Sequence, residues 1–174
     1  MIILGIDPGS RITGFGIINN QANRITYIAS GNIKVSGDSL PQRLGYIFAA
    51  VKGVIEEHQP LQMGIENVFM SRNADSALKL GQARGAAICA AHQAGLEIAE
   101  YAPREIKQAI VGTGAASKDQ VLQMVKRLLS IQQELKADEA DGLAIAICHA
   151  QFHASREKTG IDPALLKRRR SSRR

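Results

Sequence analysis

Four acidic side chains stand at positions where a folded chain would bring them together. Asp7 follows a short apolar run that is typical of a buried strand, and Glu66 comes late in a second such run. Asp138 and Asp141 are three residues apart at the start of a helical pattern, so they share one helix face. Carboxylates gathered at one point repel one another unless divalent cations neutralise them. Because oxygen ligands suit Mg²⁺ or Mn²⁺ better than Zn²⁺, these residues indicate a site for one of those ions.

Each of these carboxylates also has an ordinary structural explanation. Asp7 precedes a Pro-Gly turn that an aspartate commonly caps. Asp138 and Asp141 would complement the dipole of a helix N-terminus, an effect of roughly a few tenths of a kcal/mol. The dipole does not explain why both lie on the apolar face of their helix. A glutamate late in a buried strand is costly unless it is paired or binds a metal, so we expect Glu66 to be functional.

A second group of residues suggests contact with nucleic acid. Phe69 and Arg72 share a loop, where the aromatic ring would stack on a base and the arginine would lie near phosphate. The alternative for Phe69 is a hydrophobic plug over the end of the sheet. Lys107 and Lys118 flank a glycine-bearing loop at residues 112–118, which lacks the spacing of a nucleotide-binding P-loop. Their alternative is solvated surface.

Histidine and cysteine are present but carry no recognisable site. His149 and His153 have the i, i+4 spacing of a zinc pair, yet no cysteine or third ligand accompanies them. They also lie about 12 Å beyond Asp141 along the helix, at 1.5 Å per residue. Cys89 and Cys148 have apolar surroundings and no C-x-x-C partner, so we expect core thiols in a reducing cytoplasm.

The elements that must position these groups are strands and helices of one α/β domain. Apolar, β-branched runs predict strands near residues 1–6, 12–18, 24–35, 61–68 and 96–101. Capping boxes and helical periodicity predict helices over residues 39–58, 73–93, 103–111 and 121–130, and from 137 onward. Short polar turns join the first three strands, which predicts an antiparallel start to the sheet.

Small residues mark two places of close backbone approach. Gly14 and Gly16 alternate along the second predicted strand and leave its face bare beside Asp7, which would admit either a helix or a phosphate backbone. The 73–93 helix carries small residues at every fourth position: Ala77, Gly81, Gly85 and Cys89. Glycine costs about 1 kcal/mol in a helix interior relative to alanine, so this stripe suggests contact with the sheet or with a second subunit.

Composition and charge narrow the class of protein. A chain of 174 residues fits one domain, and no apolar run approaches the roughly 20 residues of a membrane span. The apolar start is short and soon followed by Asp7, so we expect it not to be a signal peptide. Residues 155–174 carry eight Lys and Arg against two acids, a net charge of +6 that equals the +6 of the whole chain. We therefore divide the chain into a neutral domain at 1–154 and a disordered basic tail at 155–174, which is either solubilising or a nucleic-acid arm.

Four motifs, taken together, resemble one known family. The chain reads G-I-D-P-G at its start, I-E-N-V-F at the end of the fourth strand, and A-D-S-A-L-K-L-G-Q-A-R-G and A-D-E-A-D-G-L-A-I-A in two helices. Their order and spacing over about the first 150 residues are similar to those of the RuvC family of bacterial Holliday-junction resolvases. The resemblance implies a ribonuclease-H-like fold, a mixed five-stranded sheet flanked by helices. It also implies a homodimer, for which we favour the 73–93 helix as the interface.

The resemblance also implies an activity and its residues. The family's acidic tetrad falls on Asp7, Glu66, Asp138 and Asp141, its stacking aromatic on Phe69, and its basic DNA contacts on Lys107 and Lys118. Family members use Mg²⁺ or Mn²⁺ to nick two opposed strands of a four-way DNA junction during recombination and repair. We expect two ions per site, which suits phosphodiester hydrolysis. The family works in the cytoplasm with a junction-binding protein and a hexameric branch-migration motor of the RuvAB type.

Three other readings remain to be weighed. Sugar kinases and actin-like ATPases hold phosphate with a similar Asp-Pro-Gly turn, but they need a second domain for which 174 residues leave no room. An RNA-processing nuclease of the same fold would share the first carboxylate but not the small-residue helix. A junction-binding protein without catalysis would not need all four carboxylates.

Overall fold

A single mixed sheet forms the centre of the molecule. The computed structural model describes residues 1–22, 24–68 and 73–159. Its strands are β1 (Ile2–Asp7), β2 (Ile12–Gln21), β3 (Arg24–Lys34), β4 (Gln62–Glu66) and β5 (Glu97–Tyr101), in the order β3-β2-β1-β4-β5. The first three strands are antiparallel, whereas β4 and β5 run parallel to β1. The predicted α/β fold with a mixed five-stranded sheet and an antiparallel start is confirmed.

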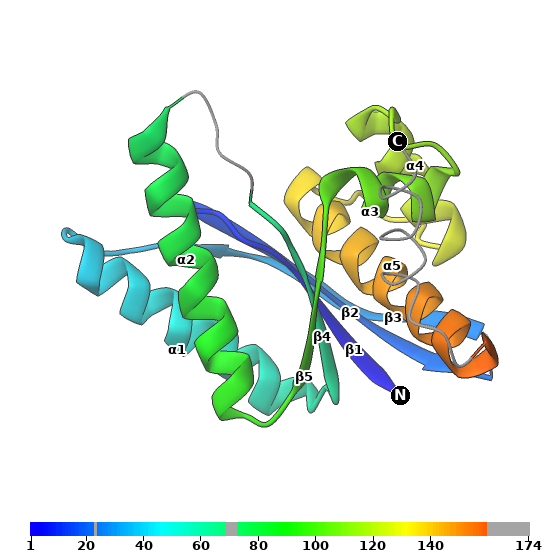
Figure 1. The fold of residues 1–174 in the computed structure, drawn as a ribbon, viewed down its shortest axis with the longest axis horizontal. Coiled ribbons are helices and arrows are strands. Elements are labelled where there is room, and N and C mark those ends of the chain that lie inside the picture. The colour runs from blue at the N-terminus through cyan, green and yellow to red at the C-terminus, as the bar shows by residue number, and fades with distance from the viewer. Residues whose placement is uncertain (23, 69–72, 160–174) are drawn as a thin grey trace, which may run out of the picture.

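Helices cover both faces of this sheet (Figure 1). On one face lie α1 (Leu40–His58) and α2 (Ala74–Gln93), and on the other lie α3 (Pro103–Val111), α4 (Lys118–Leu128) and α5 (Ala137–Thr159). Each face has its own apolar core, and none of the helices in the described part of the chain is long and apolar enough to cross a bilayer. The helices on the two faces leave the C-terminal ends of β1 and β4 uncovered, at one end of the strands.

Three differences from the predicted element boundaries affect the interpretation. β2 continues to Gln21, so the hairpin turn to β3 is shorter than expected. α4 begins at Lys118, three residues earlier than predicted, because Ser117 is its N-cap and accepts a hydrogen bond from the backbone N–H of Gln120. α5 continues to Thr159, so residues 155–159, which we had assigned to the tail, are helical in backbone.

Backbone-to-backbone contact explains the glycines of β1 and β2. A Cβ atom at Gly14 would lie 2.0 Å from the carbonyl oxygen of Asp138, and one at Gly16 would lie 2.5 Å from the backbone nitrogen of Leu143. A Cβ at Gly5 would similarly lie 2.1 Å from the carbonyl oxygen of Gly142. The bare face beside Asp7 therefore accommodates a helix, α5. This was one of the two explanations that the sequence left open, the other being a phosphate backbone.

Candidate active site

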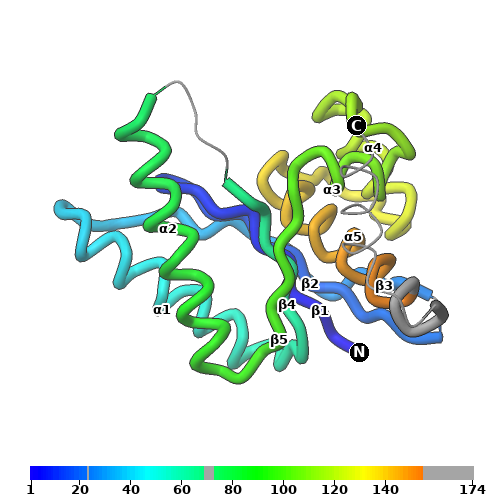
Figure 2. Tube along the Cα trace, viewed as in Figure 1, coloured from blue at the N-terminus to red at the C-terminus, as the bar shows by residue number. Residues whose placement is uncertain are grey.

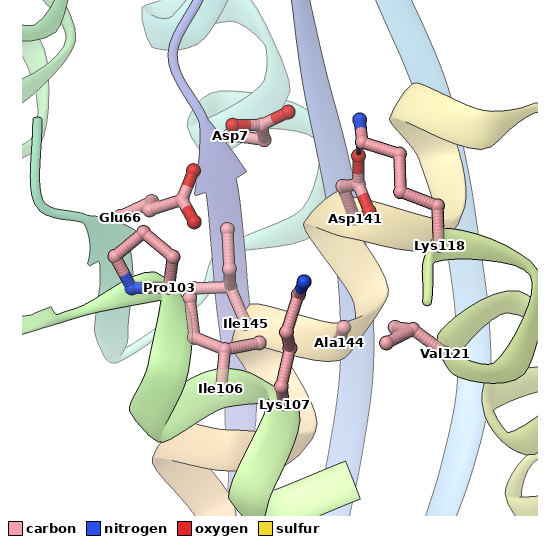
Figure 3. Close-up of a pocket in the computed structure, with 10 residues that line it drawn as sticks. All are labelled: Asp7, Glu66, Pro103, Ile106, Lys107, Lys118, Val121, Asp141, Ala144 and Ile145. Carbon is pink, nitrogen blue, oxygen red and sulfur yellow. Dashed lines mark hydrogen bonds and ion pairs between the residues drawn. The ribbon is translucent and has the colours of Figure 1, made fainter. Parts of the chain in front are cut away.

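Two carboxylates lie side by side at the open edge of the sheet. Asp7 is the last residue of β1 and Glu66 the last residue of β4. These strands are parallel neighbours in which Ile6 is paired with Ile65, so the residues that follow project from adjacent positions. Both side chains enter a cavity of about 300 Å³ (Figure 3). The end of a parallel strand pair thus supplies two oxygen donors to one point.

The helices on the α5 face supply the rest of this cavity. Asp141 of α5 faces the two strand carboxylates, and Lys107 of α3 and Lys118 of α4 close the opposite side (Figure 3). The apolar wall consists of Pro103, Ile106, Val121, Ala144 and Ile145. Five of the eight side chains singled out from the sequence therefore meet at one place.

Asp138 is nearby but does not line the cavity. Its carbonyl packs against Gly14, whose register partner in β1 is Asp7. Its negative charge contributes to raising the pKa of Lys118, which places it within electrostatic reach of the same group. Asp138, Glu139 and Asp141 are all half-buried.

Lys118 forms an ion pair with Asp141. Its Nζ atom lies 3.2 Å from Asp141 Oδ2. Asp141 raises the pKa of the lysine, first by its charge and then by this hydrogen bond, with further contributions from Asp7 and Asp138. The lysine side chain is 77% exposed, so this ion pair is easily exchanged for another partner.

Burial and crowding favour protonation of the strand carboxylates. The pKa of Asp7 is raised from 3.8 to about 8, mainly by burial and in addition by the charges of Glu66 and Asp141. Burial also raises the pKa of Glu66, which shares a hydrogen bond with Asp7. At neutral pH the pair therefore holds a proton.

The donor chemistry fits a hard divalent cation. In the described ranges, no three acidic, histidine or cysteine side chains lie close enough to form a finished set of metal ligands. The cavity does hold carboxylate oxygens whose repulsion is relieved by a proton on Asp7 and by the ammonium group of Lys118. A divalent cation would replace both the proton on Asp7 and the ammonium group of Lys118 as the positive charge beside the carboxylates. Oxygen-only donors suit Mg²⁺ or Mn²⁺.

The raised pKa of Asp7 makes a testable prediction about stability. A group whose folded-state pKa lies above its unfolded value stabilises the fold fully below the unfolded pKa, and this contribution is lost as pH rises through the folded one. Without divalent cations, the melting temperature should fall as pH rises from 3.8 towards about 8, and Asp7→Asn should flatten that slope. Asp38→Asn, at an exposed position, is the control. Equal slopes for wild type and Asp7→Asn would contradict the prediction.

Arg84 of α2 fixes the end of β4, and sequence reasoning did not identify it. Its Nε donates to the carbonyl oxygen of Glu66 at 3.0 Å, and its Nη2 donates to Asn67 Oδ1 at 3.1 Å. The same Nη2 lies 2.6 Å from Glu100 Oε2 on β5. The only signal in the sequence was its place inside the A-D-S-A-L-K-L-G-Q-A-R-G motif.

Arg84→Gln is expected to lower the rate of catalysis more than it lowers affinity for substrate. The shorter amide cannot bridge three acceptors, and a displacement of about 1 Å at a catalytic group costs up to about a hundredfold in rate. The measurement is the single-turnover rate per folded molecule, with Arg127→Gln on α4 as a control that removes an equal charge. If the variant melts earlier but retains the wild-type rate, Arg84 serves only to stabilise the fold.

His149 is engaged on both ring nitrogens. Its Nδ1 accepts from the Tyr101 hydroxyl at 2.8 Å, and its Nε2 donates to Gln62 Oε1 at 2.8 Å. Gln62 Nε2 in turn donates to Glu97 Oε2 at 2.7 Å, which fixes the amide orientation and hence the histidine tautomer. The ring is 4% exposed, so it belongs to a buried hydrogen-bonded chain between β4, β5 and α5.

The remaining sequence candidates have separate outcomes. Phe69 and Arg72 lie outside the described residues. On α2, the buried side chains are Ala83, Ala87, Ala90 and Ala91, which pack inside the protomer. A Cβ atom at Gly81 or Gly85 would meet nothing within 4 Å, and Cys89 is exposed. The small-residue stripe therefore faces outward rather than resting on the protomer's own sheet.

Known sequences similar to this chain share one description. Residues 3–149 match the sequence profile of a family described as crossover junction endodeoxyribonuclease RuvC. A protein of that name from Pseudomonas entomophila (strain L48) is 55% identical over 172 residues, which cover 99% of this chain and 97% of the relative. Another from Psychromonas ingrahamii is 56% identical over 149 residues, 86% of each chain.

Two of the solved structures similar to this one are structures of RuvC. The RuvC structure from Thermus thermophilus superposes with a TM-score of 0.80 at 32% identity, covering 89% of this chain and 96% of that one. The structure of T. thermophilus RuvC in complex with Holliday junction substrate superposes with a TM-score of 0.81 at 34% identity, covering 88% and 94%.

Proposed function

The chain belongs to the RuvC family and has its ribonuclease-H-like fold, and on that premise we propose that it resolves four-way Holliday junctions in recombination and repair as a crossover junction endodeoxyribonuclease. One observation of the site supports this activity above the others. Asp7, Glu66 and Asp141 share a cavity with two lysines at the open edge of the sheet. A cavity lined by both carboxylates and ammonium groups can hold both a cation and a phosphodiester.

The carboxylates are the proposed metal ligands. Asp7, Glu66 and Asp141 would hold Mg²⁺ or Mn²⁺ within the cavity, and Asp138 would complete a two-ion site from its edge. When bound, two ions supply an activated water and neutralise the charge that develops on the phosphate and the leaving oxygen. No side-chain nucleophile is required for this reaction.

The basic residues of the cavity would position the substrate. Lys118 is free to exchange its partner Asp141 for a phosphate oxygen, because that ion pair is exposed. The ammonium group of Lys107 points toward the same cavity (Figure 3). By the family resemblance, Phe69 would stack on an unpaired base and Arg72 would lie near phosphate.

Two opposed nicks require two active sites related by a twofold axis. Such a dimer has an isologous interface in which the same surface of each protomer meets itself. We assign this interface to α2, whose outward stripe of Ala77, Gly81, Gly85 and Cys89 presents little side-chain bulk. Leu78 beside it is 64% exposed, which adds apolar surface to the same region.

Gly85→Leu is expected to separate dimerisation from folding. The protomer has open space at this position, and leucine is about 0.8–1 kcal/mol more favourable than glycine inside a helix. The variant should therefore fold at least as well as wild type but sediment as a monomer that nicks junctions singly. Circular dichroism and sedimentation at several concentrations measure both properties. A dimer of unchanged affinity would move the interface away from α2.

Cleavage specificity tests the proposed function itself. Purified protein with Mg²⁺ or Mn²⁺ is offered a four-way junction, a linear duplex of the same sequence, single-stranded RNA and ATP. We expect symmetric paired nicks in the junction and little reaction with the others. Preferred cleavage of RNA would favour the RNA-processing alternative, ATP hydrolysis would favour the kinase-like one, and binding without cleavage would favour a non-enzymatic junction binder.

The cellular setting follows from the same proposal. The enzyme would act in the cytoplasm, after a junction-binding protein and a branch-migration motor of the RuvAB type have prepared the junction. The basic residues of 155–174 add positive charge beyond the nuclease domain at 1–154, where they would serve either DNA contact or solubility.

A further inference from the structure

A second cavity lies on the other helical face of the sheet, away from the carboxylates. It measures about 410 Å³ and is bounded by the turn between β1 and β2 and by the first turns of α1 and α2. Those two helices lie together on the side opposite α3, α4 and α5 (Figure 2). We propose that this basic groove binds the phosphodiester backbone of a junction arm, on the side of the active site opposite Lys107 and Lys118. The proposal rests on the proposed function and extends its DNA footprint.

The charge of the groove suits a polyanion. Its cations are Arg11, Arg43 and Lys79, against a single acid, Asp75. Two hydroxyl groups, those of Ser10 and Ser76, add further polar lining, and its floor is formed by the apolar side chains of Leu44, Ile47 and Ala83. Phosphate contacts supply most of the sequence-independent affinity of DNA-binding proteins, because each releases condensed counterions.

Arg11 is held at a fixed place relative to the active site. It follows Asp7 by four residues, through a turn closed by Thr13, which is 0% exposed. The Thr13 hydroxyl donates to the carbonyl oxygen of Gly9 at 3.1 Å, and the carbonyl oxygen of Arg11 accepts from the Val35 N–H at 2.9 Å. Since both ends of the turn are bonded, the groove and the carboxylate cavity keep their separation.

The guanidinium groups of the groove have donors to spare. Arg43 uses its Nε to donate to the carbonyl oxygen of Gly37 at 3.0 Å, which leaves its two terminal NH₂ groups to solvent. Within the described part of the chain, the Arg11 side chain makes no ion pair and is exposed. Arginine binds phosphate through two parallel N–H···O bonds, so both residues suit a phosphodiester.

Lys79 is the cation of the groove that is paired with a carboxylate. Its Nζ lies 2.6 Å from Asp75 Oδ2, one turn away on α2, and both side chains are about half exposed or more. An exposed i, i+4 pair is worth only about 0.3–0.5 kcal/mol, so an arriving phosphate can replace the carboxylate. Removing Asp75 should therefore free Lys79 and strengthen DNA binding.

The experiment measures how junction affinity depends on salt. Binding of a fluorescent four-way junction is titrated without divalent cation at several salt concentrations, for wild type, Arg11→Gln, Arg43→Gln and Asp75→Asn. Arg24→Gln removes the same charge from an exposed position at the opposite end of the sheet and is the control. Each lost phosphate contact should reduce the slope of log K against log salt by about 0.9.

Substitutions within the groove are expected to have opposite effects on the binding of junction DNA. Arg11→Gln and Arg43→Gln should each lower the slope by about one contact, Asp75→Asn should raise affinity, and Arg24→Gln should change neither. Cleavage at saturating protein and low salt should remain at the wild-type rate in the control variant Arg24→Gln, which lies outside the groove. If both arginine variants keep the wild-type slope, the groove does not bind junction DNA and the proposal is overturned. The same result is expected if the groove binds an acidic protein partner instead. A wild-type protein that neither binds nor cuts junctions would overturn the proposed function, which is a different result.

Discussion

Replacing Asp7, Glu66, Asp138 or Asp141 singly with the matching amide should reduce junction cleavage by about a thousandfold, because losing several kcal/mol of transition-state stabilisation costs a factor of ten for each 1.4 kcal/mol. Junction affinity should survive in all four variants. Affinity rests on basic contacts and counterion release, and removing negative charge from the site does not weaken those contacts.

Asp138→Asn is the sharpest of these four tests. Asp138 does not line the cavity, whereas the other three carboxylates do. The neighbouring Glu139 is half-buried in the same helical turn, so Glu139→Gln is a matched control that should cleave at the wild-type rate. The measurement is the single-turnover rate with Mg²⁺, beside a binding titration without it. A near wild-type rate for Asp138→Asn would reduce the catalytic set to three carboxylates.

Gly14→Ala should be strongly damaging although it adds only one methyl group. The added methyl would lie 2.0 Å from the carbonyl oxygen of Asp138, which is backbone and therefore cannot turn aside like a flexible side chain. Overpacking typically costs about 1–3 kcal/mol and occasionally more. Relief requires α5 to move away from β2, and α5 carries Asp138 and Asp141. Both stability and cleavage should therefore fall together.

Thermal melting and cleavage per folded molecule measure this effect. Gly53→Ala on α1 is the control, and it should raise the melting temperature. Its Cβ would meet nothing within 4 Å, and alanine is the better helix former by about 1 kcal/mol. Gly14→Ala protein that melts like wild type and cleaves normally would show that α5 tolerates the shift. Such a result would also weaken the argument that glycine is required beside Asp7.

The sequence predicts the elements because their signals are local. Alternating or continuous apolar runs mark β1 and β4, capping boxes mark α1 and α4, and the i, i+3 spacing of Asp138 and Asp141 is a property of one helical turn. The gathering of Asp7, Glu66 and Asp141 then follows from strand order. Neither the periodicity nor the family resemblance specified that order, which the structure supplies.

Long-range contacts account for what the sequence does not predict. Arg84 on its helix has no local pattern that distinguishes it from a solvated arginine, because its three acceptors lie on β4, on the residue after it and on β5. The outward direction of the α2 stripe likewise depends on which side of the helix meets α1 and the sheet. The displacement of Asp138 to the edge of the cavity depends on how closely α5 approaches Gly14.

The seating of α5 on the glycines of β1 and β2 has a consequence for protein synthesis. Asp7 is translated about 130 residues before Asp141, which at about 5–20 residues per second is an interval of roughly ten seconds. During that interval the emerging chain lacks the helix that completes its carboxylate set, and the glycine face of the sheet is uncovered. Under the proposed function, a growing chain cannot cleave DNA before α5 has been translated, because this helix carries Asp138 and Asp141.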